Sequence, residues 1–103
     1  MWELLEEQTM NEGAYTITTY IAPEDLDPRD ELDEEIVAGI NSGLYSWFMV
    51  KVVASKCGVE LGETYLGGCC YAHVTDFLGC DYWSDMAGEA IEIAEKKLAE
   101  LRA

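Results

Sequence analysis

The sequence predicts an α+β fold with the element order β-α-β-β-α, in which a three-stranded, mainly antiparallel sheet carries two helices on one face. Three segments are rich in β-branched and aromatic residues, as strands are, and two others repeat apolar residues at helical spacing. The chain has 103 residues, 50% of them hydrophobic, which is enough for one modest core. We therefore expect a single domain over residues 1–103, in which residues 1–13 form an arm or a frayed helical turn.

The first strand is predicted over residues 14–22, which read Ala-Tyr-Thr-Ile-Thr-Thr-Tyr-Ile-Ala. These residue types favour extended backbone, and Pro23, which follows them, ends the strand. Side chains alternate between two faces along the segment. One face is formed by Tyr15, Ile17, Thr19 and Ile21, and the other by Thr16, Thr18 and Tyr20.

The first helix is predicted over residues 28–42. Asp27 can cap the free amides at its start, and Pro28 has the backbone angle that the first helical position requires. Gly43 can adopt the left-handed conformation that ends a helix. The apolar stripe of this helix consists of Leu32, Ile36, Val37, Ile40 and Leu44.

Two more strands are predicted over residues 45–55 and 63–74, joined by a connection that Gly58 and Gly62 bracket. The first of them has a single charge, at Lys51, as expected for a central strand. One of its faces holds Phe48, Val50, Val52 and Ala54, and the other holds Trp47, Met49 and Lys51. Gly67 and Gly68 indicate a bulge in the second strand, or a close approach of another backbone.

The final helix is predicted to begin at Asp81 or Ser84 and to continue to the last turn of the chain. Glu92 and Lys96 form a favourable pair four residues apart on its wet side. Its apolar stripe consists of Met86, Ala90, Ile93, Ala94, Leu98 and Leu101.

The charge of the chain is strongly acidic, with 21 acidic and 6 basic residues and a net charge of −15. With so few bases, direct binding to nucleic acid is disfavoured, because lysine and arginine supply most of that affinity. Between Glu24 and Glu35, eight of twelve residues are acidic, with a single base at Arg29. Like charges this dense oppose the isolated fold, so the segment is expected either to meet a basic protein surface or to be a solvated face.

Tyrosine and tryptophan residues form the second notable group, because six of them fall on the predicted strands: Tyr15, Tyr20, Tyr45, Trp47, Tyr65 and Tyr71. A sheet with helices on one side leaves its other face open, and tyrosine and tryptophan are enriched where protein surfaces meet. Some of these side chains are equally expected to pack beneath the helices or against the N-terminal arm.

Residues for metal binding or catalysis are sparse. Cys69 and Cys70 are adjacent, so on a strand they point to opposite faces rather than presenting two thiolates from one turn. Cys69 and His73 share a face but lie about 13 Å apart along a regular strand. No glycine-rich phosphate loop is present. We therefore predict no catalytic residue, no metal site and no cofactor, and interpret all four cysteines as thiols, Cys57 and Cys80 included.

No signal peptide or membrane-spanning segment is recognised, because the longest uncharged stretch, residues 36–50, is shorter than the roughly 20 apolar residues that a span needs. The expected location is the cytoplasm.

The C-terminal part carries the pattern Tyr65-Leu66-Gly67-Gly68-Cys69-Cys70-Tyr71, then Phe77-Leu78, Asp81-Tyr82-Trp83 and Asp85-Met86 opening a helix rich in Glu and Ala. This pattern, which covers less than half of the chain, resembles a group of small uncharacterised proteins encoded by phages, prophages and plasmids. In size and charge the chain is also similar to phage anti-CRISPR and anti-restriction proteins, several of which imitate nucleic acid with carboxylates. The similarity in class implies an inhibitor but nominates no individual residue.

The expected function is that of a phage-type inhibitor or accessory protein that binds a basic host or phage protein, such as a nucleic-acid-binding defence complex. The acidic contacts are expected from Glu24, Asp25, Asp27, Asp30, Glu31, Glu34 and Glu35. The alternative is a non-catalytic adaptor or a self-associating module, such as a homodimer, that binds through an aromatic sheet face with Tyr45, Trp47 and Tyr71.

Overall fold

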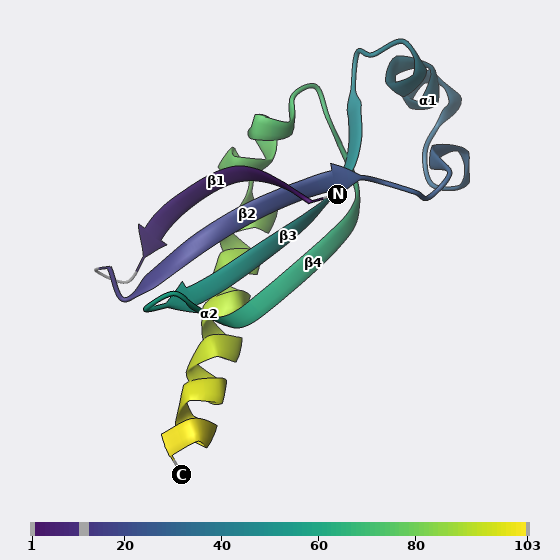
Figure 1. The fold of residues 1–103 in the computed structure, drawn as a ribbon. Helices are drawn as coiled ribbons and strands as arrows, with labels where there is room; N and C mark the ends of the chain where they lie inside the picture. The colour runs from purple at the N-terminus through teal and green to yellow at the C-terminus, as the bar shows by residue number, and fades with distance from the viewer. Residues whose placement is uncertain (1, 11–12, 103) are drawn as a thin grey trace.

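The computed structural model describes residues 2–10 and 13–102 and places a four-stranded antiparallel sheet in front of one long helix (Figure 1). The strands follow one another in space as in the sequence, in the order β1-β2-β3-β4. The molecule is elongated, with extents of 52 × 24 × 22 Å. The elements are β1 (Glu3–Met10), β2 (Tyr15–Pro23), the 3₁₀ turn η1 (Pro28–Asp30), α1 (Glu34–Asn41), β3 (Ser46–Lys56), β4 (Val59–Tyr71), the 3₁₀ turn η2 (Val74–Gly79) and α2 (Asp81–Arg102).

The α+β class and the antiparallel sheet are confirmed, but the prediction of three strands is wrong. The segment expected to be an arm contributes an edge strand, β1, which pairs with β2 from Glu3 opposite Ile21 to Met10 opposite Tyr15. A register shift between Leu4 and Glu6 inserts an extra residue into β1. Because this bulge breaks the period of two, the segment does not alternate as a regular strand does. Met1, Asn11 and Glu12, also counted in the arm, lie outside the described residues.

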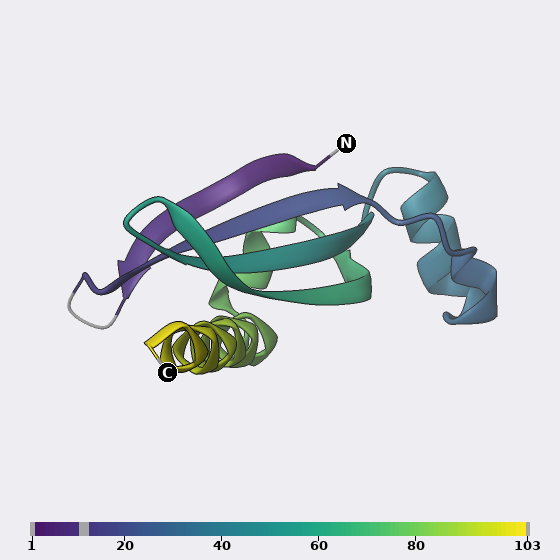
Figure 2. The same cartoon turned by 60° about the horizontal axis from the view of Figure 1, so that its bottom comes forward.

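The core lies between the sheet and α2, which runs behind β3 and β4 (Figures 1 and 2). The predicted faces of β2 and β3 are confirmed, because Ile17, Val50 and Val52 are buried under α2. Two buried hydroxyls are paired across this layer: the Trp83 indole donates to Thr19 Oγ1 at 2.8 Å, and Thr64 Oγ1 donates to the Met86 carbonyl at 3.2 Å. The helix is thereby tied to both β2 and β4 by hydrogen bonds as well as by apolar packing.

The stripe expected for α2 is rotated from the one that the structure shows. Ile93 is 39% exposed and Leu101 71% exposed, whereas Trp83, Ala87 and Ile91 are buried against the sheet. The end of α2 extends past the sheet (Figure 1), so an apolar residue there has no strand to cover it. The helix begins at Asp81, one of the two predicted starts.

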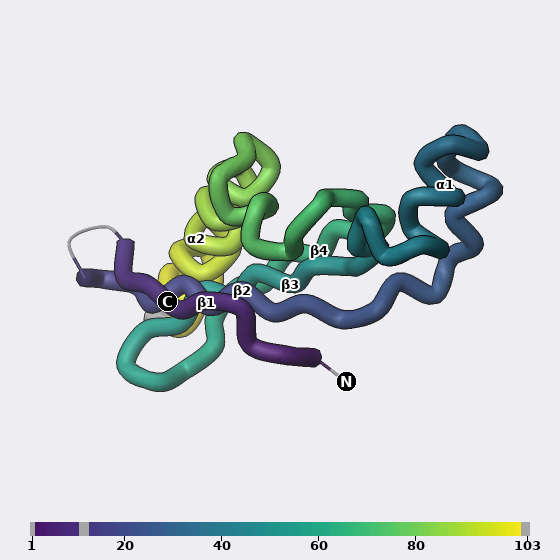
Figure 3. Tube along the Cα trace, turned by 90° about the horizontal axis from the view of Figure 1, so that it is seen from above, coloured from purple at the N-terminus to yellow at the C-terminus, as the bar shows by residue number. Residues whose placement is uncertain are grey.

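The single helix predicted over residues 28–42 is wrong in two respects. It is divided into η1 and α1, since Asp27 caps η1 and Asp33 stands at the N-cap of α1, so two starts compete within seven residues. In addition, α1 does not lie on the sheet face with α2 but beyond the end of the sheet (Figures 1 and 3). The predicted stop is confirmed, because Gly43 has a φ of +86° directly after the helix.

The connection between β3 and β4 is shorter than predicted. Lys56 pairs with Val59, so Cys57 and Gly58 form a two-residue turn in which both φ angles are positive, 54° and 78°. Gly62 belongs to β4 rather than to the connection. The bulge predicted at Gly67 and Gly68 is confirmed by a register shift opposite Phe48 and Val50 and by a φ of +67° at Gly68. Within the described residues, none of the helices is both long and apolar enough to cross a membrane.

Candidate functional site

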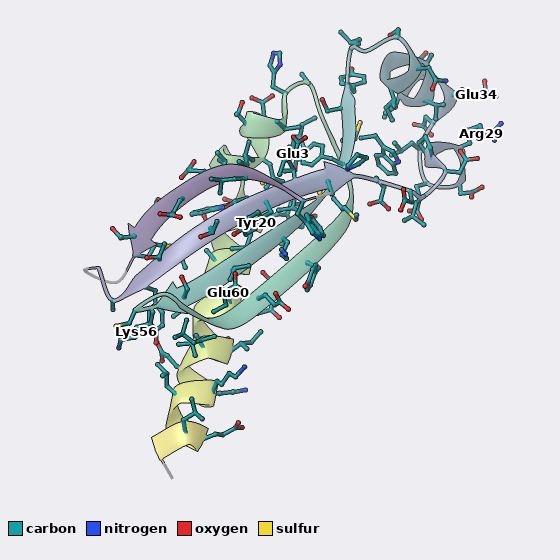
Figure 4. All side chains as sticks on the ribbon, viewed as in Figure 1. Glu3, Tyr20, Arg29, Glu34, Lys56 and Glu60 are labelled. Atoms are coloured by element: carbon teal, nitrogen blue, oxygen red, sulfur yellow. The ribbon has the colours of Figure 1, made fainter. Side chains whose placement is uncertain are left out.

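The chain between β2 and β3 forms a separate projection, which we call the acidic lobe (residues 24–45). It contains η1 and α1 and extends past the end of the sheet (Figures 1 and 2). Figure 4 shows Arg29 and Glu34 on this lobe, away from the sheet. Seven of its eight acidic side chains are exposed: Asp25, Asp27, Asp30, Glu31, Asp33, Glu34 and Glu35.

The one base of the lobe is neutralised within it. The Arg29 guanidinium donates to the Asp27 carboxylate, with Nη2 2.7 Å from Oδ2 and Nε 3.1 Å from both oxygens. The Arg29 amide donates to Asp27 as well, at 3.0 Å. The hydrogen bonds from Arg29 lower the pKa of Asp27 to about 2. Asp27 therefore both caps the start of η1 and pairs with Arg29, and the remaining carboxylates of the lobe are left without a base in the same segment.

The division of the predicted helix changes how the carboxylates are arranged. Glu31 caps the end of η1, whereas Glu34 and Glu35 occupy the first turn of α1, where negative charge is favourable to the helix dipole. The carboxylates therefore do not follow one continuous helix. The acidic side chains instead surround two short helical segments that meet at Asp33.

Two contacts attach the lobe to the sheet. The Trp47 indole, from β3, donates to the Leu26 carbonyl at 2.9 Å. Glu24 is partly buried, and its carboxylate lies beside Gly67, where a Cβ would stand 3.4 Å from Glu24 Oε2. The bulge at Gly67 and Gly68 thus leaves room for both Glu24 and the Trp47 ring. Glu24 Oε2 is buried there without a hydrogen-bond partner among the described residues, so Glu24 differs from the seven exposed carboxylates of the lobe.

Inside the lobe, Tyr45 packs against Gly39 of α1 so closely that a Cβ on Gly39 would overlap the ring. The amides of Leu44 and Tyr45 both donate to the Gly39 carbonyl, at 2.8 and 3.2 Å. This packing returns the chain from α1 to β3. A shallow hollow of about 340 Å³ lies on the outer side of the lobe, lined by Arg29, Leu32, Glu34, Val37, Ala38 and Asn41.

The three aromatic residues expected on the open sheet face make contacts within the chain. Tyr45 and Trp47 hold the lobe, as described above. Tyr71 is on the face covered by α2, with its ring 6.0 Å from Phe48 and 5.7 Å from Phe77, and its hydroxyl donates to Cys80 Sγ at 3.7 Å. Burial raises the pKa of Tyr71 to about 12. The expectation that some aromatic residues pack beneath a helix therefore holds for Tyr71 and for the buried Tyr15.

The open face, which points toward the viewer in Figure 1, carries an aromatic cluster around Lys51 that the sequence did not single out. The Lys51 ammonium lies 5.0 Å from the Trp2 ring centroid and 4.9 Å from that of Tyr20, which Figure 4 labels in the middle of the sheet. Trp2 also reaches Tyr65 of β4, with centroids 6.2 Å apart. Trp2 was missed because its segment was not predicted as a strand, and only strand pairing brings it over Lys51.

The cysteines and His73 do not share one face of the sheet. Cys69 is buried under α2, whereas Cys70 is on the opposite face, and His73 is exposed where it caps η2. All four cysteines are unpaired. Across residues 2–10 and 13–102, no group of three or more His, Cys, Asp or Glu side chains is placed to bind a metal ion.

No protein-family model matches the chain, and neither a curated protein nor a solved structure is significantly similar to it. The chemistry of its surfaces is therefore the basis for a functional assignment.

Proposed function

We propose that this chain is a binding protein rather than an enzyme, and that its acidic lobe occupies a basic, nucleic-acid-binding surface of a partner protein. The observation that supports this function is the exposure of seven carboxylates on a projecting lobe whose only base is paired internally. Carboxylates presented in this way can take the place of phosphates on a surface rich in lysine and arginine. An inhibitor of a nucleic-acid-binding defence complex, of the phage anti-CRISPR or anti-restriction kind, would act by such occupancy.

The attachment of the lobe also supports this proposal. An acidic segment that only kept the protein in solution would not require the hydrogen bond from Trp47 to Leu26, nor the packing of Tyr45 on Gly39. Both contacts reduce the freedom of the lobe before it binds, and a preordered surface loses less entropy on association. The alternative, an adaptor that binds through Tyr45, Trp47 and Tyr71, is less well supported because these side chains contact the chain itself.

The direct test replaces Glu31, Glu34 and Glu35 together by glutamine. A partner is first captured from a bacterial lysate and identified by mass spectrometry, and its affinity for both forms is then measured by calorimetry. We expect the triple variant to bind about tenfold more weakly, since three exposed charges contribute about 0.5 kcal/mol each. Affinity should fall as salt rises, because exposed charges are screened over about 8 Å at physiological ionic strength.

The matched control replaces Glu89, Glu92 and Glu95 of α2 by glutamine, which changes the net charge equally at another place. This variant should keep its affinity, and a DNA duplex should compete with the wild-type protein for the partner. Trp47 is unsuitable for distinguishing the adaptor alternative, because its loss would also release the lobe. Tyr65→Ala on the open face is the better variant. If Tyr65→Ala weakened binding while the lobe variant bound normally, the acidic lobe would not be the binding surface.

A further inference from the structure

The outer edge of β4 is a second surface with the properties of a binding site. β4 has 13 residues and pairs only with β3, so along its other side the backbone amides and carbonyls have no partner strand among the described residues. Figure 1 shows this edge at the side of the sheet away from β1, with no strand beside it and with α2 passing behind it. A long edge strand is a template for the addition of another strand.

Three hollows follow one another along the seam between β4 and α2, which we define by residues 57–71 and 82–101. The first, of about 340 Å³, contains Val59 and Leu101, and the second, of about 310 Å³, contains Gly62 and Ile93. The third, of about 410 Å³, extends from Leu66 to Tyr71 and includes Tyr82 of α2. The seam is thus recessed beside β4 for most of its length.

The two sides of the seam differ in chemistry. Pairing with β3 places Glu60, Glu63 and Tyr65 on the open face, since they lie opposite Ser55, Val53 and Lys51. On the other side, α2 presents the exposed side chains of Ile93 and Tyr82, with Lys97 lining the same hollow as Ile93. In a strand added to β4, every second side chain would lie on the open face, beside the carboxylates and the Tyr65 ring. The side chains between them would lie on the other side, beside the apolar groups of α2.

We propose that the β4 edge binds an extended segment of a partner protein in which basic and apolar residues alternate. The basic side chains would lie beside Glu60 and Glu63, and the apolar ones beside Ile93. A second copy of this chain is disfavoured as the occupant, because each copy carries a net charge of −15. The site shares no residue with the acidic lobe, so it extends the proposed function to a second contact and can be tested separately.

The test uses a short synthetic peptide in which lysine and valine alternate. Its control is a block peptide of the same composition, in which all the lysines precede all the valines. Binding is followed by hydrogen exchange of the backbone amides, resolved by residue with NMR. We expect the alternating peptide to slow exchange at outward-facing amides of β4 and to leave β1 unchanged. An alternating peptide methylated at its backbone nitrogens should not bind, since strand addition needs those donors.

Two pairs of variants distinguish peptide binding at the seam from peptide binding at the acidic lobe. Ile93→Lys should weaken the alternating peptide about tenfold, as the loss of one well-packed contact does, whereas Leu44→Lys on the lobe should not. The double change of Glu60 and Glu63 to glutamine should weaken it too, whereas the same change at Glu31 and Glu34 should not. Circular dichroism would verify that each variant is folded.

Several results would overturn the proposal. If the alternating and block peptides bound equally well, or if the Ile93→Lys variant kept wild-type affinity for the alternating peptide, the binding would be explained by general charge attraction alone. Protection of β4 amides that grows with protein concentration and needs no peptide would make a second copy the occupant. Failure of the lobe variants to weaken a captured partner would contradict the proposed function but not this site.

Discussion

Cys69 and Cys70 are neighbours in the sequence but lie on opposite faces of β4, and this decides their chemistry. Cys69 is 4% exposed beneath α2, where its thiol donates to the Leu66 carbonyl at 3.8 Å. Burial raises the pKa of Cys69 from 9.0 to about 11 and also raises that of Cys70. Cys57, in the turn between β3 and β4, is exposed. Because the thiolate is the reactive form, the three positions are expected to differ in reactivity.

Alkaline pH should destabilise the protein through Cys69. Its pKa is raised in the folded state, so the contribution to stability is complete below pH 9.0 and is lost as pH rises toward about 11. Tyr71, with a pKa of about 12, acts in the same direction at higher pH. Urea unfolding across this range should show the decline, and a Cys69→Ala variant should show a shallower one.

Alkylation tests the burial of the Cys69 thiol by an independent method. In the native protein near neutral pH, an alkylating reagent should modify Cys57 first and Cys69 only after unfolding. Peptide mapping by mass spectrometry identifies the modified position. Rapid native modification of Cys69 would contradict its placement beneath α2.

At the scale of elements, β4 and α2 approach each other closely at Gly62. A Cβ at this position would collide with the Ala90 carbonyl of α2, whereas Gly88, on the exposed side of the helix, has open space around it. The two glycines therefore affect stability in opposite directions. Gly62 permits β4 to pack on α2, whereas Gly88 only weakens the interior of a helix.

Replacing each glycine by alanine tests this contrast. Gly62→Ala should lower the free energy of unfolding by about 1–3 kcal/mol, because α2 must shift away from β4. Gly88→Ala should raise it by about 0.5–1 kcal/mol, since alanine favours a helix and meets nothing at this site. Denaturant unfolding of both variants gives the comparison. A neutral Gly62→Ala would mean that α2 packs on β4 less tightly than the structure shows.

Elements with a strong periodic signal could be predicted from the sequence, as β2, β3 and α2 were. β1 could not, because the extra residue near Leu5 moves one part of the strand out of phase with the other. The apolar spacing from Leu32 to Leu44 continued across the break at Asp33, so local capping, which determined where α1 starts, was hidden by the longer pattern. Boundaries set by caps and bulges depend on hydrogen bonds that a periodic pattern does not contain.

The acidic residues of the candidate site were visible in the sequence, since density of charge needs no fold to be counted. Their projection from the sheet was not, because it depends on α1 lying beyond the strands. The roles of Tyr45 and Trp47 also required the structure, as each is defined by a partner at least six residues away, Gly39 and Leu26. Pairing of β1 with β2 was likewise needed to place Trp2 over Lys51.

For the whole molecule, charge and shape are connected. The net charge of −15 is carried by a body 52 Å long, and eight of the 21 acidic residues fall between Glu24 and Glu35. Few bases are available to balance them, and two of these, Lys51 and Lys56, lie against aromatic rings. Self-repulsion should therefore limit the stability of the folded state.

Salt should stabilise the free protein. We expect a rise of about 1 kcal/mol in the free energy of unfolding between low and moderate sodium chloride, or about 4–8 °C in Tm for a domain of this size. Calorimetric scans across a salt series measure it. The variant with glutamine at positions 31, 34 and 35 should gain less, because part of the repulsion has been removed. A Tm that falls as salt is added would show that favourable charge pairs dominate instead.

The pairing of Pro23 with Phe48 brings the two ends of the lobe together at one corner of the sheet. The sheet thus needs only a tight turn at this corner, and residues 24–45 are an insertion into a hairpin that is already closed. Segments inserted at such corners can change length or composition without altering the register of the strands. The lobe can therefore change in length and composition while the sheet and α2 keep their packing, and under the proposed function such changes would alter which partner it binds.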